Sequence, residues 1–299
     1  MAGYFSKLFS AASASSAVYP FLAVVLLLPA TAAAPALTIT EAARSFQPGE
    51  VVVLTIDTAA PADTLRVRAF NRDMPALRVG QLQWRALVGI DLGVTPGRYP
   101  VAVDAHEDAK VARATHVLVV QPRRFPTRTL RVDEGFVNPP PSVNERIVRE
   151  ARELQELWRH SPRESRWSDG FVRPVPNPAN SRFGTRSIFN GQPRSQHGGA
   201  DFLSPTGTPV QAPNAAQVVL ARDLYFLGNT IVLDHGQGLF SILAHLSAID
   251  VRYGESVAAG HIVGRVGATG RVTGPHLHWA VRLAGARVDP LALVELLER

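Results

Sequence analysis

The stretch TGPHLHWAV, Thr273–Val281, sets two histidines one residue apart between a Gly-Pro turn and an apolar run. On a strand, residues two apart lie on the same face, so His276 and His278 are predicted to point the same way. One of them can then bind a metal ion while the other stays free for proton transfer. Taken alone, such a pair is more typical of structural strand histidines, so its interpretation depends on the rest of the chain.

A second spacing supplies two more candidate ligands. In QHGGADF, Gln196–Phe202, the residues His197 and Asp201 are separated by glycines that let the backbone bring both side chains to one point. Imidazole nitrogen and carboxylate oxygen both suit zinc, and three protein ligands leave a fourth tetrahedral position open for water. The two spacings together indicate a hydrolytic metal site whose third ligand comes from the His-x-His strand.

The composition limits the chemistry that the chain can use. Its 299 residues include no cysteine, which excludes disulfides, thiolate metal ligands and a cysteine nucleophile. Any metal ion must therefore be bound by His, Asp or Glu. The formal net charge is +6, and among the 31 Lys and Arg residues only Lys7 and Lys110 are lysines. Because the arginines are scattered along the chain, no nucleic-acid partner is expected.

Residues 1–34 are predicted to be a secretory signal peptide. Lys7 is the only charged residue before Glu41, and an apolar run at 19–30 is followed by small residues at 31–36. This pattern predicts export with cleavage near residues 32–34, after which no membrane span remains. The alternative is an uncleaved inner-membrane anchor, because the uncharged stretch at 12–34 is long enough to reach across a bilayer.

The rest of the chain is predicted to be mainly β, in two domains joined by a helical connector. Residues 35–126 alternate short β-like runs with Pro-Gly turns, a spacing typical of a small immunoglobulin-like β-sandwich. Residues 127–170 form a linker with an amphipathic helix, because Ser142–Glu145 reads as a capping box and apolar residues follow at helical spacing. Residues 171–299 change to glycine-rich turns and short strands, which predicts a second all-β domain.

Five ordered blocks resemble the lysostaphin-type (LytM-like) zinc metallopeptidases. The blocks are HGGAD at 197–201, PTGTPV at 205–210, LGNTIVLDH at 227–235, LAHL at 243–246 and GATGRVTGPHLH at 267–278. Ser181–Arg186, SRFGTR, is also similar to the start of that family's domain. The resemblance covers about residues 171–290 and implies an all-β peptidase domain built on a duplicated hybrid motif. One departure is Leu243, where the family often has tyrosine.

The resemblance also implies roles for individual residues. His197, Asp201 and His278 match the family's three ligands for one zinc ion. His245 and His276 match its two non-ligand histidines, which orient or deprotonate the attacking water and stabilise the oxyanion. Arg186 and Asn190 are candidates either for the substrate groove or for structural hydrogen bonds. No specific role is expected for the other histidines, which are His106, His116, His160, His235 and His261.

The resemblance predicts a zinc-dependent endopeptidase that hydrolyses amide bonds in the cross-linking peptides of peptidoglycan. The predicted signal and the Arg-rich, cysteine-free composition favour the periplasm of a Gram-negative bacterium as its location. The N-terminal domain would be a spacer, a lid or a surface for a regulatory protein partner. Two alternatives stay open: a catalytically silent cell-wall-binding protein or amidase activator, and a peptidase of an exported non-wall protein. The cross-link that is cleaved, the oligomeric state and any latency do not follow from the sequence.

Overall fold

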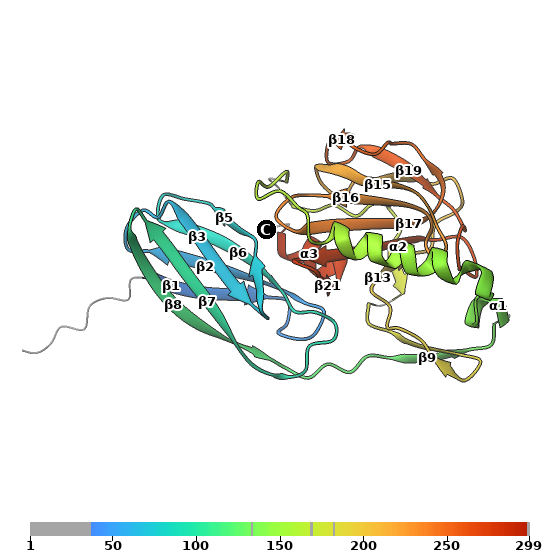
Figure 1. The fold of residues 1–299 in the computed structure, drawn as a ribbon, viewed down its shortest axis with the longest axis horizontal. Coiled ribbons are helices and arrows are strands. Elements are labelled where there is room, and N and C mark those ends of the chain that lie inside the picture. The colour runs from blue at the N-terminus through green and yellow to red at the C-terminus, as the bar shows by residue number, and fades with distance from the viewer. Residues whose placement is uncertain (1–36, 133, 168–169, 182, 298–299) are drawn as a thin grey trace, which may run out of the picture. The chain divides into compact units, whose positions relative to one another are not determined.

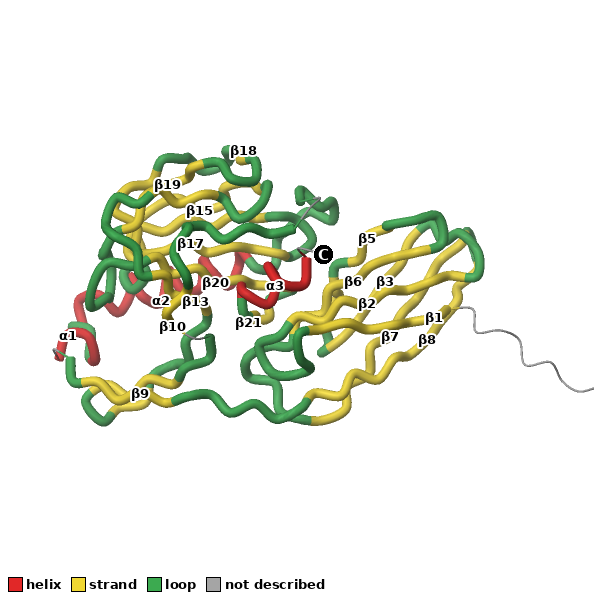
Figure 2. Tube along the Cα trace, turned by 180° about the vertical axis from the view of Figure 1, so that it is seen from behind, coloured by secondary structure: helices red, strands yellow, loops and turns green. Residues whose placement is uncertain are grey.

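The computed structural model describes residues 37–297, except for residues 133, 168–169 and 182 (Figure 1). The predicted signal peptide at 1–34 lies outside the described residues. Within them the chain is mainly β, with strands labelled β1 to β21 and three α-helices. Figure 2 shows far more yellow strand than red helix along the trace. None of the helices in this part is both long and apolar enough to cross a membrane.

The first eight strands form two antiparallel four-stranded sheets. One sheet has the order β1 (Leu37–Ala43), β2 (Val51–Thr58), β6 (Gln83–Gly89) and β5 (Ala76–Arg78). The other has the order β4 (Arg72–Met74), β3 (Thr64–Ala69), β7 (Gly97–Glu107) and β8 (Lys110–Val120). Alternate residues of these strands are buried, and Ile56, Val88 and Val103 from the two sheets belong to one hydrophobic cluster. The period-2 pattern of the sequence therefore places one face of each sheet in a common core.

The predicted connector helix is present, but the predicted cap is wrong. After β9 (Thr127–Leu130) and α1 (Glu134–Val137), a 3-10 turn at Pro141–Val143 leads into α2 (Asn144–Leu157). The residue before α2 is Val143, and no side-chain hydrogen bond caps the helix. The 3-10 turn moves Ser142 away from the capping position, so the capping-box pattern does not act as one.

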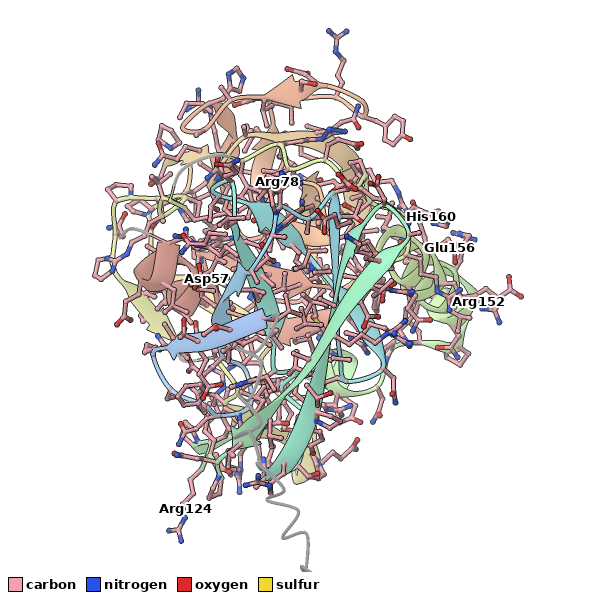
Figure 3. The ribbon with its side chains drawn as sticks, turned by 90° about the vertical axis from the view of Figure 1, so that its left-hand side faces the viewer. Asp57, Arg78, Arg124, Arg152, Glu156 and His160 are labelled. Carbon is pink, nitrogen blue, oxygen red and sulfur yellow. The ribbon has the colours of Figure 1, made fainter. Side chains whose placement is uncertain are left out.

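Helix α2 packs on the C-terminal sheet through only part of its predicted apolar face. Leu154 and Trp158 contact a cluster that includes Phe240, and the rings of Trp158 and Phe240 lie 5.1 Å apart. Arg152 and Glu156 lie on the exposed side of the helix, and the exposed His160 follows its end (Figure 3). The helix thus covers the sheet on one side and faces solvent on the other.

The C-terminal part of the chain forms a ten-stranded sheet. Its main order is β10 (Ala179–Ser181), β13 (Gly199–Phe202), β20 (Leu277–Leu283), β17 (Leu239–Ile249), β16 (Gly228–Asp234), β15 (Ala216–Leu224) and β18 (Ser256–Val257). Three more strands pair with these outside the main order: β14 (Pro209–Gln211), β19 (Ile262–Val266) and β21 (Ala286–Val288). Helix α3 (Pro290–Leu297) follows, and Trp279 and Phe202 are fully buried in the core.

The connector also contributes a strand to a small third sheet. Strand β9 pairs in parallel with β11 (Arg186–Phe189), which pairs with β12 (Gln192–Pro193). Asn190 reinforces this pairing, because its side chain accepts a hydrogen bond from the Val132 amide at 3.0 Å and donates one to the Val132 carbonyl at 2.8 Å. Of the two alternatives for Asn190, the structural hydrogen bond is the one observed.

Ion pairs link the N-terminal strands to the end of the chain. The Arg287 guanidinium donates to both carboxylate oxygens of Asp91, at 2.8 and 3.1 Å, and the Arg287 amide donates at 2.8 Å. Burial opposes ionisation of Asp91, but these hydrogen bonds outweigh it and lower the pKa of Asp91 to about 2.

The Asp91 pair should therefore stabilise the fold in a pH-dependent way. Asp91→Asn is expected to lower the free energy of unfolding by on the order of 2 kcal/mol at neutral pH. Since the folded-state pKa lies below the unfolded value, the difference is present above about pH 4 and shrinks as the pH falls toward 2. Urea denaturation at several pH values measures it. Asp250→Asn, which removes an exposed ion pair with Arg265 at 3.7 Å, is the control and should cost less than about 1 kcal/mol.

Candidate metal centre

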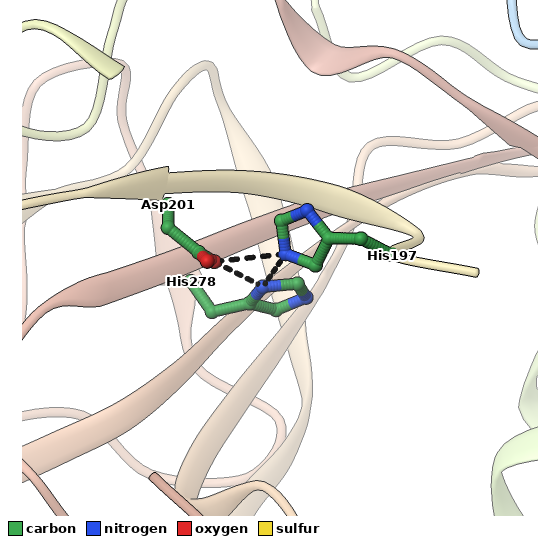
Figure 4. A group of neighbouring side chains, drawn as sticks. All are labelled: His197, Asp201 and His278. Atoms are coloured by element: carbon green, nitrogen blue, oxygen red, sulfur yellow. Dashed lines mark hydrogen bonds and ion pairs between the residues drawn. The ribbon is translucent and has the colours of Figure 1, made fainter. Parts of the chain in front are cut away.

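The three predicted ligands lie together. His197 Nε2 is 2.9 Å and His278 Nδ1 is 2.8 Å from the same Asp201 oxygen, Oδ1, and the two nitrogens are 3.1 Å apart (Figure 4). The side chains of all three are between 13% and 15% exposed, so one end of the group remains open to solvent. His197 and Asp201 are four positions apart in the sequence and His278 is more than seventy positions further on, yet the three side chains converge on one point.

The pairing of β13 with β20 creates this convergence. The strands are antiparallel, and Asp201 lies directly opposite His278. A side chain at Gly199 would lie 2.5 Å from the Trp279 carbonyl oxygen and 2.8 Å from the His278 ring, so only glycine allows the strands to approach this closely. The amide of His197 donates to the Thr185 carbonyl at 2.9 Å, which holds the first ligand against the small third sheet.

The donor set fits a zinc ion. Tetrahedral zinc with bonds of about 2.0–2.2 Å needs ligand atoms roughly 3.3 Å apart, close to the spacing observed here. Burial opposes ionisation of Asp201, but hydrogen bonds from His197 and His278 hold its pKa well below the usual range. Burial lowers the pKa of His278, which favours the neutral ring. An ionised carboxylate and neutral imidazoles are the forms that bind a metal ion.

His245 lies beside the group in a strained backbone conformation. Its φ is 65°, in the left-handed region that residues other than glycine rarely adopt, and the strand pairing shifts register around it. Its Nδ1 lies 3.0 Å from the Thr269 carbonyl, which can only accept, so Nδ1 carries the proton and Nε2 keeps a lone pair. Burial, with the neighbouring histidine charges, lowers the pKa of His245 to about 3, so the ring is neutral at physiological pH.

His276 also lies beside the group, immediately before β20. An isolated bridge pairs it with Gly267, and its Nδ1 donates to the Gly274 carbonyl at 2.9 Å. Its Nε2 is 3.9 Å from the Asp201 carboxylate, and its ring centroid is 4.9 Å from that of His245. The two non-ligand candidates therefore lie next to one another beside the ligand candidates, with the same ring tautomer.

The five residues lie in a groove of about 600 Å³. Three arginines that the sequence analysis did not single out line the same groove: Arg128, Arg194 and Arg271. Two of them stand close to the motifs in sequence, three residues before His197 and five before His276. This proximity to the motifs could have indicated that the two arginines line the groove. Spacing in the sequence alone, however, does not distinguish an arginine in the groove from one on the exposed surface.

The other histidines lie outside this groove. His235 is fully buried, where Nδ1 donates to the Ala215 carbonyl and Nε2 lies 2.9 Å from the Ser241 hydroxyl. That hydroxyl also accepts from Trp279 Nε1 at 3.2 Å, so the three side chains form a buried polar chain behind β20. His160 and His261 are exposed, and His116 pairs with Glu41.

Comparison with known proteins agrees with this arrangement. A model of peptidase family M23 matches residues 195–290, which contain all five candidate residues. A solved structure of a putative peptidase M23 from Pseudomonas aeruginosa is 33% identical, with a TM-score of 0.66, over 84% of this chain and 95% of that one. The chain belongs to peptidase family M23. The resemblance found in the sequence blocks is thereby confirmed.

Named relatives share this region. Peptidoglycan DD-endopeptidase ShyA of Vibrio cholerae is 34% identical over 139 residues, 46% of this chain and 30% of ShyA. DD-carboxypeptidase/endopeptidase Mpg of Neisseria meningitidis is 38% identical over 97 residues, 32% of this chain and 22% of Mpg. The chain therefore spans less than a third of the length of each of these curated relatives.

The close approach at Gly199 yields a test with a neighbouring control. Gly199→Ala should push the His278 ring and the β20 backbone apart from β13, and should weaken zinc binding by tenfold or more, the scale of losses when the support of a ligand is disturbed. Gly198→Ala should leave zinc affinity nearly unchanged, because its nearest contact would be 4.0 Å from Arg287 Cδ. Competition with a chromogenic chelator measures both. Equal affinities for the two variants would contradict the role of Gly199.

Proposed function

We propose that this chain is a zinc-dependent endopeptidase that hydrolyses amide bonds in the cross-linking peptides of peptidoglycan. The observation that carries the proposal is the convergence of Asp201, His197 and His278 on one point, with His245 and His276 next to them, in an open groove. Membership of family M23 and the names of the relatives support it.

His197 Nε2, Asp201 Oδ1 and His278 Nδ1 are the atoms that would hold the ion. Zinc, when bound, supplies a Lewis acid that polarises the scissile carbonyl and makes water a nucleophile near neutral pH. The protein contributes a carboxylate at Asp201 that stays ionised and a His278 ring whose lowered pKa favours the neutral form, and these are the forms that bind a metal ion.

His245 and His276 would carry out the proton chemistry. Each donates Nδ1–H to a backbone carbonyl, which leaves the Nε2 lone pair to accept a hydrogen bond or a proton from the attacking water. A ring protonated at Nε2 can then donate to the oxyanion or to the leaving amine. The backbone contacts fix both rings before substrate binds, which lowers the cost of orientation.

The bond we favour is a direct cross-link between stem peptides. ShyA and Mpg are named as a DD-endopeptidase and a DD-carboxypeptidase/endopeptidase, which supports cleavage between two D-configured centres. A glycyl bridge would use the same metal chemistry, so the shape of the groove would make the distinction.

The finer domain assignment is also a proposal. We infer a signal peptide at 1–34, an immunoglobulin-like sandwich at 35–126, a connector at 127–170 and a peptidase domain with a duplicated hybrid motif at 171–299. The shared core of the first two sheets supports the sandwich, and the ten-stranded sheet supports the peptidase domain. The sandwich would be a spacer, a lid or the surface for a regulatory protein partner. Export to the periplasm follows from the signal, with an inner-membrane anchor if it is not cleaved.

Digestion of purified sacculi tests the function. The zinc-loaded full chain should release uncross-linked muropeptides, identified by mass spectrometry, and a chelator should abolish the release until zinc is restored. Intact sacculi from diverse bacteria would favour the silent wall-binding protein. Cleavage of exported protein substrates alone would favour the non-wall peptidase.

Two variants separate the roles within the His-x-His pair. His278→Ala should lose zinc, whereas His276→Ala should keep zinc and lose about 10²- to 10⁴-fold in kcat, the usual contribution of a general acid or base. Zinc content by atomic absorption and hydrolysis of sacculi measure the two effects. Equal loss of zinc from both variants would mean that the assignment within the pair is wrong.

A further inference from the structure

The connector forms part of one wall of the groove that contains the candidate metal group. This wall is made by two paired segments, β9 with the residues that follow it, and β11. The family model matches residues 195–290, so the metal group lies inside the matched region and this wall lies before it. The residues of these two segments that line the groove, which we call the β9–β11 wall, are Arg128, Leu130, Val132, Ser187 and Phe189.

The lining residues share one face of the β9–β11 pair. In the parallel register, Ser187 lies opposite Arg128, and Phe189 lies opposite Leu130. Arg128 Nε donates to the Ser187 hydroxyl at 3.0 Å, so these two side chains meet on the same face. Thr129 lies between two lining residues, and the period of a strand turns its side chain to the opposite face. Alternate positions of β9 therefore determine the surface that the groove presents.

The connector strand is held in place by several contacts with the segment beside it. The Asn190 amide donates to the Leu130 carbonyl at 3.0 Å, and the Asn190 side chain binds both the amide and the carbonyl of Val132. A side chain at Gly184, where φ is 80°, would collide with the Phe125 ring, so glycine lets the connector approach closely. The wall is therefore in place before a ligand binds, which lowers the cost of ordering on binding.

The β9–β11 wall presents apolar side chains to the groove. Leu130, Val132 and Phe189 are partly exposed. Leu203, directly after β13, lines the same groove and is 60% exposed. Covering such surface with an aliphatic group of a ligand is favourable. Because one groove of about 600 Å³ contains both this surface and the metal group, a peptide with its amide at the metal group can place a neighbouring side chain on the wall.

We propose that Leu130, Val132 and Phe189 bind an aliphatic side chain of the peptide substrate next to the scissile amide. This inference rests on the proposed function. The metal group then cleaves the amide, and the β9–β11 wall selects peptides by the apolar side chain beside that amide. A single apolar group that is well covered in a binding site changes kcat/KM by about tenfold or more. The connector is thus a specificity-determining part of the peptidase as well as a link between domains.

The first test removes the apolar groups of β9. In the zinc-loaded full chain, Leu130→Ser/Val132→Ser should lower kcat/KM for a purified cross-linked muropeptide dimer about tenfold, mainly through a higher KM. Leu130→Met/Val132→Ile keeps the apolar surface and should stay within about twofold of the wild-type value. The matched control, Thr127→Ser/Thr129→Ser, alters the opposite face of the same strand and should change neither constant. Zinc affinity should be the same in all of these chains.

Photo-cross-linking gives a second readout, which does not depend on turnover. A benzophenone amino acid is incorporated at Val132 in one chain and at Thr129 in another, and each zinc-loaded chain is irradiated with the same dimer. Mass spectrometry should detect adducts of the dimer or of its products on the chain labelled at Val132. The yield from the chain labelled at Thr129 should be several times lower. If the serine variant does not fold, this comparison still decides whether the wall touches the substrate.

Three outcomes would overturn the inference, and they differ from one another. Equal adduct yields from the two labelled chains, in a protein that cleaves the dimer, would show that the substrate does not lie on the β9–β11 wall and would leave the proposed function in place. An equal rise of KM in the serine variant and in its matched control would mean that β9 only supports the fold. An intact dimer after incubation with the zinc-loaded wild-type chain would overturn the proposed function and this inference with it.

Discussion

The close antiparallel approach of β13 and β20 is the constraint on which the rest of the site depends. It sets Asp201 opposite His278, and it is possible because Gly199 has no side chain to meet the Trp279 carbonyl and the His278 ring. A shift of one residue in this pairing would turn one of the two side chains to the other face of the sheet. Trp279 and Phe202 are buried in the core, and a shift would expose them, so it is unfavourable. Core packing therefore fixes the strand register that places the Asp201 and His278 side chains.

The neighbouring histidines are positioned by backbone groups rather than by other side chains. Thr269 and Gly274 each accept a hydrogen bond from a ring Nδ1, and His245 reaches its place only through a left-handed backbone conformation. Such a conformation costs on the order of 1–3 kcal/mol, and it persists where the surrounding structure supports it. Here the strain lies next to the candidate metal ligands, where a fixed orientation of the His245 ring would favour proton transfer.

The sequence predicted which side chains lie together better than it predicted the start of the connector helix. The His-x-His spacing and the glycines between His197 and Asp201 predict local geometry only. That these two distant segments come together was predicted from the order of the five blocks, which resembles the peptidase family. Ser142 was misread because a capping box and a 3-10 turn share the same residues. The pairing of β9 with β11 joins distant segments, and it leaves no periodic pattern in the sequence.

The most direct measurement is an anomalous-difference map recorded at the zinc absorption edge from crystals of the zinc-loaded chain. We expect one strong peak about 2.0–2.2 Å from His197 Nε2, Asp201 Oδ1 and His278 Nδ1, the usual distances for zinc bound to nitrogen and oxygen. His245 and His276 should lie beyond bonding distance of that peak. A peak bonded to either of them in place of a predicted ligand, or no peak at this site, would show that the assignment of the zinc ligands is wrong.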